Sequence, residues 1–530
     1  MHAFSEKERW FFTIYIKTTT NYSIPMHKKT LKRIRRILGA VFFLGITLMF
    51  LDFTGTLHHY LGWMAKIQFL PAVLALNIIV IAGLLILTLV FGRIYCSVIC
   101  PLGVFQDGVA GMHNFFKKSR YTYSKAHNIL RYIILGLFIV ALIAGIGSIV
   151  ALLAPYSSYG RIVQNLFAPI YQWCNNGLAH LSERFNSYTF YGKEVWIRSL
   201  PTFIIAAVTF VAVVVLAWRN GRTYCNSICP VGTFLGLFAR FSWFKMHINE
   251  DKCIQCGLCN KNCKASCIDG KSGFVDYTRC VTCGNCMAVC PKEAIEFKHA
   301  PVVKTQKQTS APEVQNDNST VDTGKRAFLI GTAVAIGTAA FAQEKKKVDG
   351  GLAIIEDKVA PHRQTPIVPA GAKSLKNLQT HCTGCQLCVS QCPNDVLRPS
   401  TSLMHLMQPE MSFERGYCRP ECTACSDVCP AGAISRITKE EKTSIQKGIA
   451  VWVKQNCIVI TDGVPCGNCA RHCPAEAIEM VPLDPSDLSK GRIPAVNETK
   501  CIGCGACEHL CPTRPMSAIY VEGIERHRTI

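Results

Sequence analysis

Charged residues are scarce in this chain. Asp, Glu, Lys and Arg make up 17% of the 530 residues, whereas apolar residues make up 49%, a balance that favours a membrane protein. Acidic residues are the scarcer kind, 35 against 57 basic ones, which leaves a net charge of +22. The basic residues flank apolar segments and do not form one stripe. The excess therefore fits the positive-inside rule of membrane proteins, and we expect no nucleic-acid partner.

Two kinds of motif are also missing. The sequence has no nucleophile–base motif of the kind used in acyl or phosphoryl transfer, which argues against those reactions. No small-residue cleavage site follows the first apolar run, which argues against a removable secretory signal. We therefore expect residues 1–36, with their six basic residues near the end, to form a cytoplasmic tail.

Cysteine, in contrast, is abundant, with 30 in the chain. Disulfides explain such numbers in small secreted domains, but here 24 of the 30 fall into six ferredoxin-like quartets. Between Cys253 and Pro291 the run C-x2-C-x2-C-x3-C of bacterial two-cluster ferredoxins occurs twice. Zinc is the alternative for C-x2-C pairs, yet a close fourth cysteine is not a zinc-finger pattern. The spacing therefore predicts six [4Fe–4S] clusters.

Cross-ligation predicts which cysteines share a cluster, because three close cysteines hold one cluster and the fourth holds the other of the pair. The predicted sets are Cys253, Cys256, Cys259 and Cys290; Cys280, Cys283, Cys286 and Cys263; Cys382, Cys385, Cys388 and Cys429; Cys418, Cys422, Cys425 and Cys392; Cys457, Cys466, Cys469 and Cys511; and Cys501, Cys504, Cys507 and Cys473. Cys263 lacks the usual following proline, so Cys267 is an alternative ligand in its place. Segments 294–297 and 477–480 are expected to be small strands that close a ferredoxin fold.

Four long apolar stretches precede these quartets, at 37–53, 67–91, 129–154 and 200–218. Each is near the ~20 residues that a bilayer core requires, so we expect a four-helix membrane bundle joined to α+β ferredoxin-like iron–sulfur domains. Basic residues are concentrated in alternate loops, which puts the N-terminus and the first two clusters in the cytoplasm. The protein is thus expected in the cytoplasmic (inner) membrane as a multi-pass protein.

The membrane half contains an internal repeat. The motif G-R-I-Y-C-S-V-I-C-P after the second stretch matches G-R-T-Y-C-N-S-I-C-P after the fourth. Their cysteines are Cys96, Cys100, Cys225 and Cys229. These four thiols are interpreted as an additional cluster or metal site, as redox dithiols, or as residues that merely pack at a helix end, and spacing does not choose among these.

The expected division of the chain follows from these patterns. The predicted segments are the tail 1–36, a four-span domain 37–245, a two-cluster ferredoxin domain 246–298, a polar linker 299–326, a twin-arginine-like signal or fifth short span 327–342, a connector 343–380, and a four-cluster ferredoxin domain 381–530. Either reading of 327–342 places the last domain outside the cytoplasm.

The motifs together resemble a known pair of proteins. Residues 30–298 resemble the NapH type of ferredoxin-like membrane quinol dehydrogenase, and residues 323–530 resemble the NapG type of periplasmic ferredoxin, here in one polypeptide. The resemblance implies electrons taken from menaquinol in the membrane pool and passed to an extracytoplasmic terminal reductase or multihaem cytochrome. No S/T-G-A-T flavin site is present, so no flavin is expected.

Three functions remain open at this point. The first is quinol-linked electron transfer, the second an assembly factor that reduces a metal or cofactor for a partner enzyme, and the third a docking scaffold stabilised by clusters. For the quinol site the candidates are Arg93 and Arg222 on the inner face, which we favour because the repeated cysteines converge there. The outer alternative is His58 and His59, since histidine titrates near neutrality.

Overall fold

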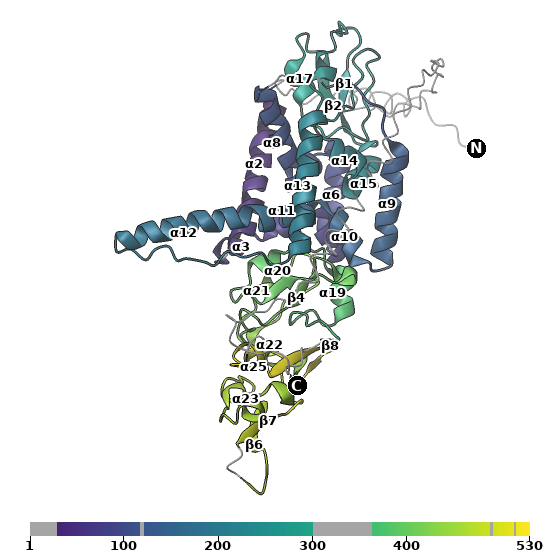
Figure 1. Cartoon of the computed structure of the whole chain (residues 1–530). Helices are drawn as coiled ribbons and strands as arrows, with labels where there is room; N and C mark the ends of the chain where they lie inside the picture. The colour runs from purple at the N-terminus through teal and green to yellow at the C-terminus, as the bar shows by residue number, and fades with distance from the viewer. Residues whose placement is uncertain (1–28, 53, 117–120, 300–362, 488–490, 514–515) are drawn as a thin grey trace, which may run out of the picture.

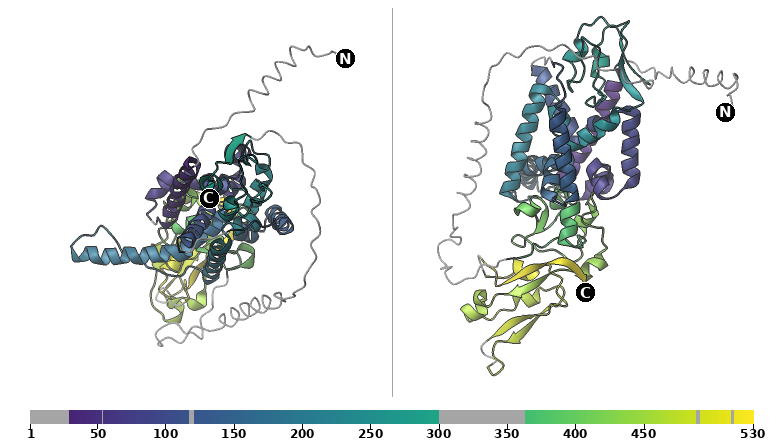
Figure 2. Two further views of the ribbon diagram at one scale, coloured as in Figure 1. Left: turned by 90° about the horizontal axis from the view of Figure 1, so that it is seen from above. Right: turned by 90° about the vertical axis from the view of Figure 1, so that its right-hand side faces the viewer.

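The computed structural model describes residues 29–52, 54–116, 121–299, 363–487, 491–513 and 516–530. The described residues form three regions in a row, as Figure 1 shows. A helical layer (residues 30–239) occupies the middle, a two-cluster unit (244–299) lies at one end, and a four-cluster unit (363–530) lies at the other. The right-hand view of Figure 2 shows the same order, so the two cysteine-rich units lie on opposite sides of the helices.

The helical layer is built from helices of very different lengths. They are α2 (Thr30–Leu51), α3 (Thr56–Leu61), α4 (Trp63–Lys66), α5 (Phe69–Leu74), α6 (Ile78–Phe91), α7 (Tyr95–Val98), α8 (Pro101–Phe116), α9 (Asn128–Ile143), α10 (Gly147–Leu153), α11 (Pro155–Ile162), the π-helix η1 (Val163–Phe167), α12 (Ala168–Arg184), α13 (Leu200–Asn220), α14 (Thr223–Ser227) and α15 (Pro230–Ala239). Helix α12 projects sideways from the layer in Figure 1.

The expected four-helix membrane bundle is wrong. In the part of the chain that the structure describes, only α2 and α13 are both long and apolar enough to cross a membrane. Helices α6, α9 and α15 are apolar but shorter. The architecture is a mostly helical body with small sheets in its ferredoxin units, and the fifth short span expected at 327–342 lies outside the described residues.

Two of the apolar runs break because of local backbone conformation. Run 67–91 divides into α5 and α6, since Leu76 takes a left-handed conformation (φ 51°) and the Asn77 side chain caps the start of α6. Run 129–154 divides into α9 and α10 at Gly145, whose φ is 71°. Hydropathy alone does not detect such breaks, because the residues on both sides are apolar.

The two-cluster unit is closed by one antiparallel pair of strands. Strand β1 (Phe244–Ile248) enters the unit and β2 (Ile295–His299) leaves it, with Phe244 opposite His299 and Ile248 opposite Ile295. The short helices α16 (Leu258–Lys261) and α17 (Asn285–Val289) each contain the third close cysteine of their group, Cys259 and Cys286. Strand β2 confirms the closing strand expected at 294–297.

The four-cluster unit repeats this plan with longer loops. Its helical elements are α19 (Leu375–His381), α20 (Leu387–Ser390), η3 (Leu403–His405), α21 (Ala424–Asp427), α22 (Lys439–Ser444), η4 (Lys454–Asn456), α23 (Ile458–Thr461), α24 (Asn468–Arg471) and α25 (Ala506–His509). Its strands are β3 (Leu397–Pro399), β4 (Pro409–Met411), β5 (Ile445–Trp452), β6 (Ile478–Pro482), β7 (Arg492–Val496) and β8 (Ile519–Thr529), paired β3–β4, β5–β8 and β6–β7. Strand β6 confirms the strand expected at 477–480.

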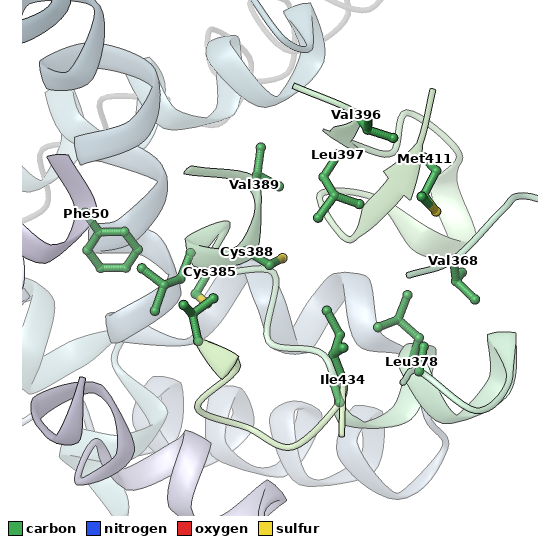
Figure 3. Close-up of a cluster of buried hydrophobic side chains, with 14 of the residues drawn as sticks. Phe50, Val368, Leu378, Cys385, Cys388, Val389, Val396, Leu397, Met411 and Ile434 are labelled. Atoms are coloured by element: carbon green, nitrogen blue, oxygen red, sulfur yellow. The ribbon is translucent and has the colours of Figure 1, made fainter. Parts of the chain in front are cut away.

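One hydrophobic core continues from the helical layer into the four-cluster unit. Figure 3 shows Phe50, at the end of α2, beside Cys385 and the apolar residues that follow it. The contact leaves no room for a larger residue at Gly160 of α11, because a Cβ there would lie 2.6 Å from the Cys385 carbonyl oxygen and 2.7 Å from the Phe50 ring. The first outer cysteine loop is therefore packed directly on the helices.

Candidate functional site

Left-handed residues shape the cysteine loops. In the four evenly spaced quartets, the residue before the second cysteine and the residue after it both have positive φ. These pairs are Gln255 and Gly257, Thr282 and Gly284, Gly384 and Gln386, and Gly503 and Gly505. Glycine adopts this conformation at little cost, which explains the recurring C-G step. Gln386 is the exception, because it stands where the other three loops have glycine.

The structure assembles the predicted ligands of the two-cluster unit into two groups. Cys253, Cys256, Cys259 and Cys290 line one small cavity. Cys263 lies close enough to Cys280, Cys283 and Cys286 to interact electrostatically with each of them. Thiolates gathered around a small cavity fit a cluster, although the assignment of each ligand stays a prediction.

Cys267 lies beside the second group. Its sulfur is 3.5 Å from that of Cys263, and both side chains are buried. The hydrogen bond from Cys267 lowers the pKa of the Cys263 thiol to about 7, and the same bond raises the pKa of Cys267. Because the thiolate is the ligand form of cysteine, this geometry favours Cys263 as ligand and Cys267 as its hydrogen-bond donor.

The four-cluster unit assembles four more groups. Two of them ring small cavities, one lined by Cys392, Cys418, Cys422 and Cys425 and the other by Cys457, Cys466, Cys469 and Cys511. In the other two, Cys429 interacts electrostatically with Cys382, Cys385 and Cys388, and Cys473 interacts with Cys501, Cys504 and Cys507.

Buried lysines add positive charge beside these sulfurs. Lys442 is 3% exposed and donates to the Arg419 carbonyl oxygen at 2.6 Å and to the Cys422 carbonyl oxygen. Lys447 is 1% exposed and lies near Cys501 and Cys504. Its positive charge favours the thiolate form of both cysteines. Within the described ranges, no group of three or more His, Cys, Asp or Glu side chains is arranged to hold a single metal ion.

The repeated motifs of the helical layer meet in its interior. Cys96, Cys100, Cys225 and Cys229, which we call the middle site, are each 3–4% exposed and interact electrostatically with one another. Two come from the α7–α8 repeat and two from the α14–α15 repeat. The structure thus brings together cysteines that are more than 120 residues apart.

Each repeat supports the other through an arginine. Arg93 donates to the Cys225 carbonyl oxygen at 3.3 Å, and Arg222 donates to the Cys96 carbonyl oxygen at 2.7 Å. Both arginines are buried, at 0% and 1% exposure. Arg93 also donates to the Thr278 carbonyl oxygen at 2.9 Å, which connects the middle site to the two-cluster unit. Because the arginine of each motif holds the backbone of a cysteine in the other motif, the two motifs form one site.

The four quinol-site residues expected from the sequence lie in different settings. Arg93 and Arg222 are enclosed by the repeats, and neither lines one of the cavities described for this structure. His59 is exposed with its ring edge against Tyr60, and His58 is partly buried, with a pKa lowered by burial. Their part in quinol binding stays a prediction.

Three buried tyrosines, Tyr95, Tyr156 and Tyr224, belong to the core cluster that contains middle-site cysteines and Cys385. Tyr95 interacts electrostatically with the middle-site cysteines, and Tyr156 interacts with both Tyr95 and Cys385. Tyr224 interacts with Arg161, which in turn interacts with Cys385. Tyr95 and Tyr156 are 2% and 1% exposed. The middle site, these tyrosines and the first outer quartet thus belong to one buried cluster of side chains.

Comparison with known families agrees with this reading of the cysteines. A "4Fe-4S binding domain" model matches residues 73–120 and 202–249, which contain the two repeated motifs. Further "4Fe-4S binding domain" models match residues 274–296 and 382–396, and a "4Fe-4S dicluster domain" matches residues 464–514. The chain is an iron–sulfur protein that binds several [4Fe–4S] clusters.

Individual relatives give the family. The chain is 34% identical over 170 residues to the "Methylamine utilization ferredoxin-type protein MauM" of Methylobacillus flagellatus, covering 30% of this chain and 70% of that protein. It is 31% identical over 143 residues to the "Ferredoxin-type protein NapF" of Escherichia coli K12, covering 27% and 77%. The chain therefore belongs to the family of ferredoxin-type electron-transfer proteins. It is also 24% identical over 198 residues to the "Putative electron transport protein YccM" of Escherichia coli K12, covering 37% of this chain and 47% of that protein. No solved structure matches it.

Sequence reasoning missed several residues of these sites. Asp107 pairs with Arg222 at 2.8 Å and also with Lys264, the residue after Cys263. No motif marks Asp107, because the second repeat has Gly236 at the equivalent position. Gln386 did carry a signal, since it replaces a glycine that the other evenly spaced quartets share.

Proposed function

We propose that this protein takes electrons from a quinol and passes them to an acceptor outside the cytoplasm, through clusters that are connected across a membrane. Six [4Fe–4S] clusters held by the six quartets, and one further redox centre at the middle site, form the conducting path. The middle site is the main support for this proposal, because it lies inside the helical layer between the two cysteine-rich units. It is connected to the two-cluster unit through Arg93 and to the four-cluster unit through the shared buried core. When bound, iron–sulfur clusters supply one-electron transfer without bond chemistry on a substrate.

The residues of the middle site fit such a centre. Four buried thiols form the donor set, and the two exchanged arginines hold the backbone of Cys96 and Cys225 in place. Arg93 also offsets negative charge in a region of low polarity, since none of its hydrogen-bond partners among the described residues is a carboxylate, whereas Arg222 is paired with Asp107. The sulfur of Cys225 accepts from the Gln106 amide at 3.2 Å.

The surface of the helical layer supports membrane association. The most apolar window of α13 is only 22% buried within the protein, and that of α2 is 33% buried. Large apolar side chains stand outward on the layer, for example Ile79 at 86% and Val208 at 63% exposure. Apolar surface of this extent is unfavourable in water and suits a lipid environment. In this proposal α2 and α13 cross the membrane, with the two-cluster unit in the cytoplasm and the four-cluster unit outside.

Menaquinol is the proposed donor, and an extracytoplasmic reductase or multihaem cytochrome the proposed acceptor. Anaerobically purified protein should hold about 24 iron atoms in the six quartets, and about four more where the middle site holds a cubane. A menaquinol analogue should bleach the visible absorption of these clusters. Protein that contains zinc and no iron–sulfur absorption would contradict the proposal, and so would intact clusters that no quinol reduces, as expected of a scaffold.

A further inference from the structure

A cavity lies where the helical layer meets the four-cluster unit. Its volume is about 360 Å³, and its walls are mainly apolar. Residues from four separate segments line it, among them Asn165, Trp173, Trp196, Phe203 and Gln386. A cavity of this size with aromatic walls and a few polar groups is typical of a small-molecule site.

Gln386 is the unusual residue in this cavity. It lies in the loop between Cys385 and Cys388, in a left-handed conformation with φ 66°. The equivalent residues of the other evenly spaced quartets, Gly257 and Gly284 among them, are glycines. A side chain here is kept at a cost in backbone strain, and strain of this kind is concentrated at functional sites.

The Gln386 side chain has an unused donor. The residue is 4% exposed, and its Oε1 accepts from the Asn165 amide at 3.0 Å. Its Nε2 has no hydrogen-bond partner among the described residues. A buried donor left unpaired is costly, so a ligand oxygen in the cavity would satisfy it.

The surrounding residues hold the polar wall in place. Asn165 belongs to the π-helix η1, an irregularity often found at functional sites. Arg198 donates to the Gln164 side chain at 3.3 Å and to Asp395 of the four-cluster unit at 3.3 Å. The ring of Trp196 is contacted by the Arg415 guanidinium, 4.5 Å from the ring centre.

From this geometry we propose that the cavity binds the ring of an isoprenoid quinol, which deepens the proposed function and rests on it. The aromatic and apolar walls accept a planar ring, and Gln386 Nε2 donates to one ring oxygen. Oxidation of the quinol breaks two O–H bonds. The two protons pass to solvent at the cavity mouth, where Glu194 is exposed, and the two electrons pass singly to the [4Fe–4S] clusters, beginning with the Cys385 quartet.

This cavity differs from both quinol sites that were expected from the sequence. The cavity contains none of Arg93, Arg222, His58 and His59. It adjoins a quartet of the four-cluster unit and not the two-cluster unit. Electrons from this cavity reach the outer clusters directly and the inner clusters through the middle site.

The test is direct binding of menadione, a naphthoquinone without the isoprenoid tail, to the full-length cluster-loaded protein. Isothermal titration is run on wild type, on Gln386→Gly and on Gln255→Gly. Gln255 is a matched control because it is also a left-handed glutamine beside a cluster cysteine, but it is exposed and lies in the two-cluster unit. Both changes relieve strain, so both variants are expected to fold and keep their visible spectrum.

We expect at least tenfold weaker menadione binding in Gln386→Gly and unchanged binding in Gln255→Gly. Equal binding by all three proteins would overturn the inference, as would binding that phospholipid displaces equally well in all three, which would mark a lipid site. Loss of binding in Gln386→Gly with unchanged cluster content supports it. Reduction of the wild-type clusters by menaquinol is measured separately. Its failure would refute the proposed function, whereas its success without menadione binding refutes only this site.

Discussion

Replacing Asp107 with asparagine tests how the two-cluster unit is held on the helical layer. The Asp107 carboxylate is buried and pairs with Arg35 at 2.5 Å, Arg222 at 2.8 Å and Lys264 at 3.5 Å. Burial alone raises the pKa of this carboxyl, but the neighbouring cations, Arg222 first, hold it well below its usual range. One anion thus joins α2, the second repeat and the cluster unit.

The substitution leaves three buried cations without an acid. Breaking a single buried ion pair costs about 3–5 kcal/mol, and cations about 4 Å from a carboxylate interact with it by about 4 kcal/mol each at an effective dielectric constant of 20. We expect the free energy of unfolding to fall by at least about 3 kcal/mol in Asp107→Asn. Urea unfolding followed by the visible absorption of the clusters measures it. Asp251→Asn, at an exposed acid of the two-cluster unit, is the control and should change stability by less than about 0.5 kcal/mol.

A double-mutant cycle isolates the contribution of the Arg35–Asp107 pair to stability. Arg35→Met should destabilise the wild-type protein more than it destabilises Asp107→Asn, because the arginine has already lost its acid in the variant. Equal effects in both backgrounds would mean that the pair contributes nothing. A loss of less than about 1 kcal/mol in Asp107→Asn itself would refute the account of this network.

Three further predictions concern the four-cluster unit. Cys504→Ser should lower the iron content by about four atoms and leave the other clusters visible by electron paramagnetic resonance, and an unchanged iron content would refute the ligand set. Burial, with Lys447 beside it, lowers the pKa of His527 to about 4 from 6.5. The unfolded chain then binds the proton first as the pH falls, so stability present above pH 6.5 should decline towards pH 4, by at most about 3 kcal/mol. Thermal melts between pH 7.5 and 5 measure this, and His527→Gln should flatten the slope; equal slopes contradict it. Gly503→Ala should destabilise far more than Gly463→Ala. Both have positive φ, but a Cβ at Gly503 would lie 2.6 Å from the backbone of β5, while one at Gly463 meets nothing within 4 Å. Similar melting temperatures would refute that reasoning.

The cysteine chemistry was readable from the sequence because it is local. Three cysteines within seven residues, as at Cys253–Cys259, define a cluster loop whatever the rest of the fold does. The closing strands at 294–297 and 477–480 follow the same local logic. The four-span bundle was wrong for the opposite reason, because single residues such as Leu76 and Gly145 break helices inside apolar runs.

The contacts between distant segments could not be read from the sequence. The repeat showed that Cys96 and Cys225 occupy equivalent positions, but not that each repeat's arginine supports the other repeat's cysteine. The cavity at Gln386 is built from four separate segments, so no single stretch describes it. Only the glutamine in place of glycine could have drawn attention to that loop.

Conduction through the middle site is tested most directly in quinone-free proteoliposomes. Dithionite, which does not cross the membrane, is added outside, and the reduction of each cluster is followed by electron paramagnetic resonance and visible absorption. The account predicts that clusters at both ends become reduced in the wild type. In the Cys100→Ser/Cys229→Ser double variant, only the clusters on the side of the reductant should become reduced. Reduction at one end only in the wild type, or at both ends in the variant, would contradict it.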